Sequence, residues 1–460
     1  MKESKILYCI FSLGLLGGCA TYQPAPLETI AKLNTKVEQL NMDASQHVEL
    51  PKPWRKRSVN LGDGLNEAEL IQLAVLNNPH LAALESKLKE ANAQLIQAGL
   101  LPDPQLSLSA DIPRGNNATL VTAYGVGLGF DLQSLITREA RQNSATKQAK
   151  AVYLQILWQE WQVIQQVRIL YRRALMQDQQ LELTHRQFLQ TKTNWQVQQS
   201  ALKQGNATLD TEGLARISMM GTETAWFEAQ RQCNTTMHQL TLLLGLSPQT
   251  KLPLSVPEQG VASWFIQPPH GKKLNALLNN IDHKRPDLMA LKAGYAAQED
   301  KVREQILSQF PSFTIGANSL RDTGNAWTLG PFMNLNLPLL NGNRGNVAMA
   351  RATRSRLRSE YRDRLTAAEV EVHRIVSDQQ LAFDELKALQ ERLPDMNVMM
   401  QHMRKALTAG NVDMLTFTTL QNSQFYQRMK VLLLEQAVLE QTVALDTLLG
   451  LLPLPTGGSE

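Results

Sequence analysis

The chain has 460 residues, of which 43% are hydrophobic and only 6% aromatic, a composition that is lean for the packed cores of several globular domains. Helix-rich, elongated structure fits this balance better. The formal net charge of +4 is small and the charges are dispersed, which gives no sign of a nucleic-acid-binding surface.

The first 18 residues resemble a bacterial lipoprotein signal peptide. Two lysines precede an apolar stretch over residues 6–16, and small residues lead into Cys19. Cleavage would leave Cys19 as the lipidated first residue, and because Ala20 does not resemble an inner-membrane retention signal, outer-membrane delivery is expected. The competing interpretation is a short buried helix with an incidental cysteine. With Cys9 removed and Cys19 acylated, only Cys233 remains, which excludes an intrachain disulfide.

The mature chain offers no run of 18 apolar residues and hence no transmembrane helix, so any membrane crossing has to use β-strands. Residues 19–63 are polar and contain several prolines, which predicts a leader that tethers the lipid to the body. Two helical patterns follow over residues 66–78 and 79–101, and Pro79 suits the first position of the second helix.

Between residues 104 and 132 the hydrophobic period changes from helical to alternating. The pattern predicts two strands joined by a polar turn at residues 114–117, each about ten residues long, the length of a tilted transmembrane strand. In the second strand an apolar row beginning at Tyr124 alternates with a row of glycines, Gly125, Gly127 and Gly129. We expect the apolar row to face lipid and the small row to face a lumen. A nucleotide-binding glycine loop is the weaker interpretation, because no acidic partner follows about 20 residues on.

A run of 68 residues without glycine or proline follows, residues 137–204. As one helix it would be roughly 100 Å long, far longer than the helices of a compact domain. A turn at Gly205-Asn206 ends the run, and a returning helix is expected up to residue 246.

The second half of the chain repeats the first. Pro79 corresponds to Pro286, Pro102 to Pro311, Gly205 to Gly410 and Gly245 to Gly450, at offsets of 207, 209, 205 and 205 residues. The matches keep their order and lie at element boundaries, which indicates an internal tandem duplication. The predicted organisation is a signal peptide (1–18), a lipid-anchored leader (19–63), a first repeat (64–250, with strand pair 104–132 and hairpin 137–246), a linker (251–271), a second repeat (272–452, with strand pair 312–338 and hairpin 346–451) and a C-terminal tail (453–460).

The second long run carries a heptad seam. Its apolar positions step alternately by four and three residues and only Gln379 among them is polar, which predicts a left-handed coiled coil. The seam positions are Tyr361, Leu365, Ala368, Val372, Ile375, Gln379, Ala382, Leu386, Leu389, Leu393, Met396, Met400, Met403 and Leu407. The first run keeps the same rhythm less strictly, and Arg168 interrupts it.

Four strands and two half-covered hairpins in one chain leave open edges and apolar faces. Closure of several copies into a ring removes both, and three copies would give about 12 strands, although the number three does not follow from the sequence.

Together these motifs resemble the outer membrane efflux protein family, the TolC-like exit ducts. The likeness covers nearly the whole mature chain and includes the duplication, the proline break before each half, the strand entry Leu101-Pro102-Asp103-Pro104, the exit Leu337-Pro338-Leu339 into Asn341-Gly342-Asn343, and the paired Gly-Asn turns. It implies a mainly helical fold with a membrane β-barrel. In this fold a homotrimer forms an α-barrel of long antiparallel hairpins below a 12-stranded β-barrel, with four strands per chain, in the outer membrane of a Gram-negative bacterium.

The resemblance also implies a function. The expected role is the passive exit duct of a tripartite efflux pump, which conducts small toxic compounds or metal ions and docks a periplasmic adaptor fed by an inner-membrane transporter of the RND type. The lipoprotein signal favours efflux over the alternative, type I protein secretion. The alternative from a different class of protein is a lipid-anchored periplasmic coiled-coil scaffold without a pore. The glycine-bearing strands of transmembrane length argue against this alternative.

The family likeness places the candidate site at the hairpin turns. In the family such turns lie at the periplasmic entrance, so the expected tip and adaptor-docking residues are Gly205, Asn206, Leu209, Gly410, Asn411 and Leu415. Where some relatives carry aspartates at the entrance constriction, this chain has Thr416 and Thr419, with Asp210, Glu212 and Asp413 as nearby substitutes. For each acid, a solvated helix-start residue near the positive end of the helix dipole is the simpler interpretation.

The sequence predicts neither a catalytic activity nor a bound cofactor. Met396, Met400 and Met403 fall on seam positions, which favours packing over soft-metal binding. The histidines show no ligand spacing, Cys233 has no cysteine nearby, and no nucleophile with a matching base is evident, so no metal site and no enzyme are expected. An arginine-rich segment over residues 344–364 is interpreted as a solvated helix face, or as a contact for anionic headgroups or the lumen.

Overall fold

The computed structural model describes residues 22–27, 33–42, 59–60, 62–114, 119–257 and 260–451. The predicted signal peptide, the lipidation site Cys19, most of the leader, most of the first strand-joining turn and the C-terminal tail lie outside the described residues.

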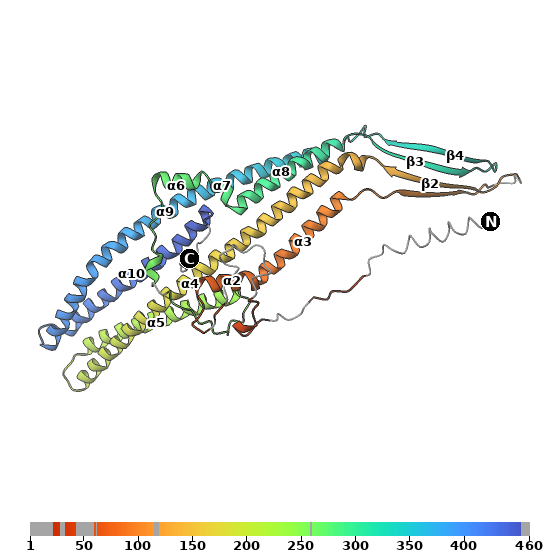
Figure 1. The fold of residues 1–460 in the computed structure, drawn as a ribbon. Coiled ribbons are helices and arrows are strands. Elements are labelled where there is room, and N and C mark those ends of the chain that lie inside the picture. Colours follow the sequence, from red (N-terminus) through yellow and green to blue (C-terminus); the bar gives the residue numbers. More distant parts are fainter. Residues whose placement is uncertain are drawn as a thin grey trace.

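Two very long helices dominate the molecule (Figure 1). α4 (Gln133–Lys203) has 71 residues and α9 (Arg344–Thr408) has 65. They turn back as the antiparallel partners α5 (Leu209–Leu243) and α10 (Met414–Leu449). Pro394 lies inside α9 without ending it. The free energy gained by packing along the long helix exceeds the cost of the one backbone hydrogen bond that proline removes. Within the described residues, no helix combines enough length with enough apolar character to cross a membrane.

The heptad seam of α9 is confirmed. All 14 seam side chains are buried or half-buried. Val372 and Ile375 share a buried cluster with Leu445 and Leu449 of α10. The one polar member, Gln379, is 1% exposed, and its amide donates a hydrogen bond of 2.8 Å to the Thr442 hydroxyl of α10. The partner helix thus supplies an acceptor for the buried amide nitrogen of Gln379.

The order of elements repeats along the chain. α3 (Pro79–Gly99), two strands, α4 and α5 are followed by α8 (Pro286–Leu307), two strands, α9 and α10. Asn78 caps α3, its side chain accepting the N–H groups of His80 and Leu81. Arg285, at the equivalent place before α8, makes no cap and pairs with Asp287 at 2.6 Å. The shorter elements are η1 (Val37–Gln39), α2 (Glu67–Asn77), η4 (Val261–Trp264), α6 (Gly271–Leu278) and α7 (Ile281–Lys284).

The described part of the leader contributes to the core instead of serving only as a tether. Val37 and Leu40 are buried in the same cluster as α2 and the middle of α4. The Ser247 N–H donates to the Asn34 carbonyl at 2.8 Å. In the same region the Leu65 N–H donates to the Pro253 carbonyl at 2.9 Å. Leader and linker therefore both run across the middle of the molecule, where the largest core lies.

The four strands form one antiparallel sheet in the order β1-β2-β3-β4. Their bounds are β1 (Gln105–Asp111), β2 (Ala123–Asp131), β3 (Ser312–Arg321) and β4 (Trp327–Asn336). The central pairing joins the two repeats, with Gly129 of β2 opposite Gly316 of β3. Within the described sheet β1 and β4 are edge strands, each paired on one side only.

The predicted alternation of β2 is confirmed. Tyr124, Val126 and Leu128 are exposed, whereas the intervening glycines are buried. The ring of Phe332 lies over this glycine row, within 3.2 Å of the position that a Cβ on Gly129 would occupy. The aromatic ring thereby fills the space that the glycines leave.

Gly316 is the most constrained glycine of the sheet. A Cβ there would overlap the Leu128 carbonyl oxygen and lie 2.6 Å from the Phe332 ring. Because a backbone oxygen in a paired strand cannot move aside, we expect Gly316→Val to destabilise the sheet by at least about 1–3 kcal/mol. Gly330→Val on β4 is the matched control, since no atom lies within 4 Å of its Cβ position. Yield of folded protein and the β signal in circular dichroism measure the effect, and equal yields for the two variants would contradict it.

Candidate functional site at the hairpin tips

The α4–α5 turn depends on one left-handed residue. Gly205 has φ +74°, a conformation that costs other residues free energy. Its N–H donates to the Leu202 carbonyl at 3.0 Å, and the Asn206 N–H donates to the Ala201 carbonyl at 2.8 Å. These two bonds satisfy carbonyls that the end of α4 would otherwise leave unpaired.

The α9–α10 turn reproduces this geometry. Gly410 also has φ +74°, and the Asn411 N–H donates to the Ala406 carbonyl at 2.9 Å. Asp413 then caps α10, because its carboxylate accepts the Thr416 N–H at 2.8 Å and the Thr416 hydroxyl at 2.7 Å. The Cβ positions of both glycines have no atom within 4 Å, so backbone conformation alone requires glycine here.

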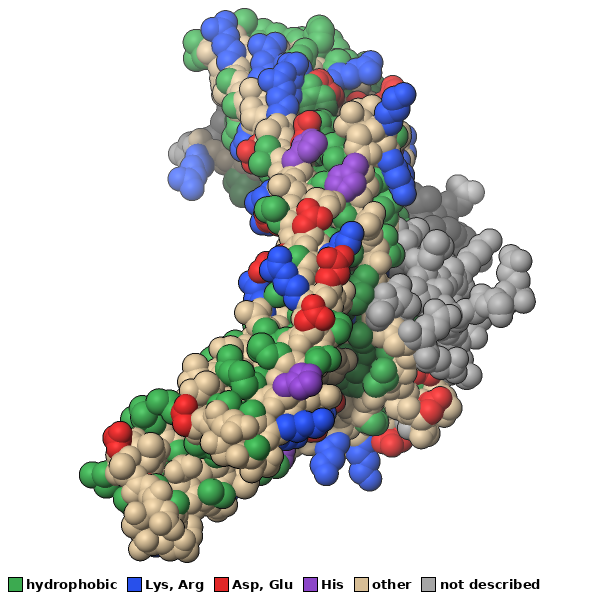
Figure 2. Space-filling view, turned by 90° about the vertical axis from the view of Figure 1, so that its left-hand side faces the viewer, with side chains coloured by type: hydrophobic (Ala, Val, Ile, Leu, Met, Phe, Trp, Pro, Cys, Tyr) green, Lys and Arg blue, Asp and Glu red, His purple; other side chains and the backbone are tan. Residues whose placement is uncertain are grey.

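Exposed apolar side chains follow both turns. Leu209 is 75% exposed and Leu415 is 51% exposed. Figure 2 shows the molecule from the hairpin end. The α4–α5 hairpin ends in the lowest part of this view, where the surface is mainly hydrophobic or uncharged. Leu415 also lines a groove of about 370 Å³ between α5 and α10, together with Leu214, Ile217, Met414 and Tyr426. An exposed apolar groove of this kind is typical of a surface that binds a partner.

The acidic candidates near the tips already have local partners. A hydrogen bond with Thr208 lowers the pKa of the exposed Asp210. The Thr416 N–H lowers the pKa of Asp413. Glu212 accepts a hydrogen bond of 2.7 Å from the Trp195 indole of α4, and the Thr419 hydroxyl donates to the Leu415 carbonyl. A constriction role for these residues stays a prediction.

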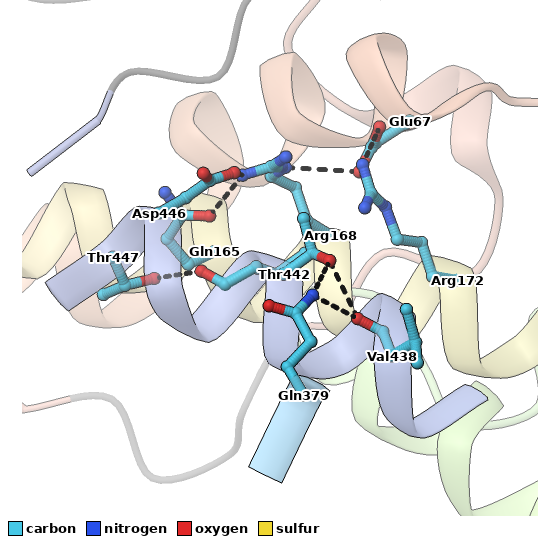
Figure 3. Close-up of polar contacts among 10 residues, drawn as sticks. Glu67, Gln165, Arg168, Arg172, Gln379, Val438, Thr442, Asp446 and Thr447 are labelled. Atoms are coloured by element: carbon cyan, nitrogen blue, oxygen red, sulfur yellow. Dashed lines mark hydrogen bonds and ion pairs between the residues drawn. The ribbon is translucent and has the colours of Figure 1, made fainter. Parts of the chain in front are cut away.

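Sequence reasoning missed a buried charge cluster in the middle of the molecule, which Figure 3 shows. Arg168 and Arg172 of α4 are 5% and 3% exposed. Arg172 binds both carboxylate oxygens of Glu67 on α2, at 3.0 and 3.3 Å. Arg168 contacts Glu67 at 3.3 Å and Asp446 of α10 at 3.1 Å. The heptad interruption at Arg168 was therefore the visible signal of a buried ionic contact.

The two cationic and two anionic groups balance one another in a poorly solvated place. Burial raises the pKa of Asp446, and the adjacent Arg168 guanidinium opposes the rise. Burial also lowers the pKa of Arg172, and Glu67 opposes that change. The Arg172 guanidinium lies 4.7 Å from the centre of the Trp264 ring, which adds a cation–π contact. The cluster ties one helix of the second repeat to two helices of the first.

A row of polar contacts continues from this cluster along α4 and α10 towards the tips. Arg173 binds Glu440 through two hydrogen bonds of 2.8 and 2.7 Å. Further along, the contacts are between neutral amides: Gln180 with Gln436, Gln187 with Asn422, and Gln190 with Gln421. The two hairpins are thus joined by charged contacts near the middle of α4 and by neutral ones from there towards the tips.

The fold has a four-stranded sheet at one end and two long hairpins at the other. A family model described as outer membrane efflux protein matches residues 70–246 and 277–451. The chain belongs to the outer membrane efflux protein family, whose members are channels and not enzymes. The two matched stretches agree with the tandem duplication.

Solved structures of three channels have similar folds. CusC, described as forming a transmembrane channel, matches with a TM-score of 0.68 and 18% identity over 94% of this chain and 99% of its own. The outer membrane protein VceC of Vibrio cholerae matches with a TM-score of 0.67 and 16% identity over 84% and 96%. The CmeC outer membrane channel of Campylobacter jejuni matches with a TM-score of 0.66 and 14% identity over 92% and 94%. No curated protein sequence matches the chain.

Removal of an arginine should lower the free energy of unfolding more in the buried cluster than in the Arg173–Glu440 pair. Arg168→Leu leaves Asp446, whose side chain is 25% exposed, without its partner and removes one of the two arginines that pair with Glu67, whose side chain is 13% exposed. We expect this change to cost about 3 kcal/mol. Arg173→Leu breaks a pair whose side chains are 31% and 25% exposed, and we expect a loss of about 1 kcal/mol. Thermal unfolding followed by circular dichroism measures both variants. Equal midpoints would show that the buried cluster is not a critical joint.

Proposed function

We propose that this chain is the exit duct of a tripartite efflux pump, through which small toxic compounds or metal ions pass passively to the exterior. One observation supports the proposal above all. A four-stranded sheet, whose outer strands are each paired on one side only within the described residues, continues into two helices about 100 Å long by the helical rise. Such a chain has a membrane end and a long soluble end. Membership in a family of outer membrane efflux channels supports the same function.

Ring closure is part of this proposal. The outer edges of β1 and β4 carry backbone groups that lipid cannot satisfy, so a neighbouring copy has to supply the missing strand pairing. In a homotrimer, four strands from each chain would make a barrel of about 12 strands, within the range of outer membrane barrels. The exposed row of Tyr124, Val126 and Leu128 would then face lipid, and the glycine row would face the lumen.

The contacts between the hairpins support opening by an iris-like movement. Each of the amide pairs near the tips can be replaced by hydrogen bonds to water, so separating them costs only about 1 kcal/mol per bond. The buried cluster at mid-length is much harder to separate, because its charges would lose their partners. We infer that the hairpins pivot near Arg168 and Arg173 and separate first at the tips.

A periplasmic adaptor is the proposed trigger of this movement, and an inner-membrane transporter of the RND type the proposed source of cargo. Leu209 and Leu415, with the groove between α5 and α10, offer the adaptor an apolar surface beside two rigid turns. The tip residues Asn206 and Asn411 lie next to the turn glycines and would meet the adaptor first.

Conductance tests the duct itself. The full chain, purified in a non-ionic detergent and added to a planar lipid bilayer, is expected to be an oligomer that conducts ions. A monomeric or dimeric species without conductance would instead support the scaffold without a pore.

Substitution of the tip glycines tests the entrance. In Gly205→Val/Gly410→Val a β-branched residue must adopt a left-handed conformation that costs about 1–2 kcal/mol at each turn. We expect normal oligomers but loss of efflux in the native host, measured as dye accumulation and as susceptibility to drugs and metal salts. Gly205→Asn/Gly410→Asn is the matched control, because asparagine tolerates this conformation and should preserve efflux. Unchanged efflux in the valine variant would refute the tip assignment.

Lipid anchoring at Cys19 is a separate proposal, supported by the signal-like residues 1–18. It places the mature chain in the outer membrane of a Gram-negative bacterium with an acylated N-terminus. Metabolic labelling with palmitate is expected to mark the wild-type chain and the control variant Cys233→Ser, but not Cys19→Ser. A wild-type chain without label would refute the anchor and leave the duct proposal untouched.

A further inference from the structure

A second cavity, of about 640 Å³, lies between the two hairpins near their tips. Its walls come from α4 of one hairpin and from α9 and α10 of the other. Its cationic lining residues are Arg186 of α4, Arg404 and Lys405 of α9, and Arg428 of α10. We call this cavity the basic pocket, because four of its side chains are cationic.

The positive charge of the basic pocket is only partly neutralised. None of the described residues that line it carries a carboxylate. Arg186 pairs with Glu182 outside the pocket at 2.6 Å, and both side chains are more than half exposed. Arg428 donates to the neutral Asn397 side chain at 2.6 Å. Among the described residues neither Arg404 nor Lys405 has an ion-pair partner.

Two apolar side chains in the lining of the basic pocket are buried. Met400 and Phe425 are each 8% exposed. Gln187 is also buried, and its amide donates to Asn422 at 3.0 Å. Gln421 is buried and donates to Gln190 at 2.9 Å. The buried amides therefore have partners, whereas among the described residues Arg404 and Lys405 have no ion-pair partner.

We propose that the basic pocket binds a small organic anion with an apolar body, such as a carboxylate or sulfonate attached to a ring or short chain. Guanidinium and ammonium groups bind such anions through charge-assisted hydrogen bonds. The apolar body would cover Met400 and Phe425. The volume lies within the range of small-molecule sites, whereas an inorganic anion would fill only a small part of it.

Such a ligand would bridge the hairpins. Arg186 stands on α4, and Arg404 and Lys405 stand on α9 within six residues of the turn glycine Gly410. An occupant that contacts both sides is lost when the hairpins separate, so binding favours the joined arrangement. Binding to the basic pocket requires no particular adaptor, pump or cargo, whereas its effect on the hairpins rests on the movement proposed above.

The test is binding of naphthalene-2-sulfonate to the full chain in a non-ionic detergent, measured by isothermal titration calorimetry. We expect saturable binding with one site per chain, weakened by added salt because the contact is ionic. Naphthalene-2-methanol lacks the charge and inorganic sulfate lacks the apolar body, so each should bind at least about tenfold more weakly.

Two substitutions locate the site. Arg404→Gln/Lys405→Gln should weaken naphthalene-2-sulfonate binding by about tenfold or more. The matched control, Arg374→Gln/Lys387→Gln, removes two positive charges from the same helix outside the basic pocket and should bind normally. Gln401→Glu provides an independent variant that adds a carboxylate to the lining and should also weaken binding. Circular dichroism and size-exclusion chromatography confirm that each variant is folded.

Each other outcome refutes the proposal. Absence of saturable binding would mean that these residues form no specific binding site. Equal losses of affinity in Arg404→Gln/Lys405→Gln and in Arg374→Gln/Lys387→Gln would mean the same. Sulfate binding as tight as that of naphthalene-2-sulfonate would show that the pocket binds anions in general and that the apolar body contributes nothing. An acidic peptide that binds where naphthalene-2-sulfonate does not would identify the basic pocket as a protein-docking surface. In all of these cases the conductance of the channel can still be present, so the proposed function is tested separately.

Discussion

A buried arginine on α4, Arg168, joins the two repeats of the chain through Asp446 of α10, and Arg172 lies beside it. Arg168 and Arg172 can be buried only because Glu67 and Asp446 reach them from α2 and α10, since an unpaired charge in that place would cost several kcal/mol. This requirement fixes the register between α4 and α10 at one point. The long contacts on either side of that point then follow from the helical geometry.

The contacts within a hairpin and between hairpins differ in kind. Within the α9–α10 hairpin an apolar seam excludes water along most of its length, so its two helices move as a unit. Between α4 and α10 polar contacts change from ion pairs to neutral amides towards the tips. Exposure of these amides to water costs little free energy. The same helices can therefore be rigid across one interface and separable across the other.

Local patterns predicted most of the fold. The heptad period of α9, the alternation of β2 and the duplication were readable because each is a regular spacing of residue types. The pairing of β2 with β3, the burial of Arg168 and the basic pocket were not, because they join residues from different repeats. Arg168 and Asp446 are 278 positions apart, and no local spacing reports such a contact. The tip turns were predicted from Gly-Asn pairs, yet the capping role of Asp413 needed the geometry of α10.

Glycine is required at the tips and in the sheet for different physical reasons. Gly316 in the sheet has no room for a side chain, so its environment depends on how neighbouring strands pack. Gly205 and Gly410 have open space around them and a left-handed backbone, so the shape of each turn is set within the turn itself. A turn that does not depend on its neighbours keeps its form when the hairpins move apart. Leu209 and Leu415 would then be presented in the same geometry whether the entrance is closed or open, which is what a surface that binds before the movement requires.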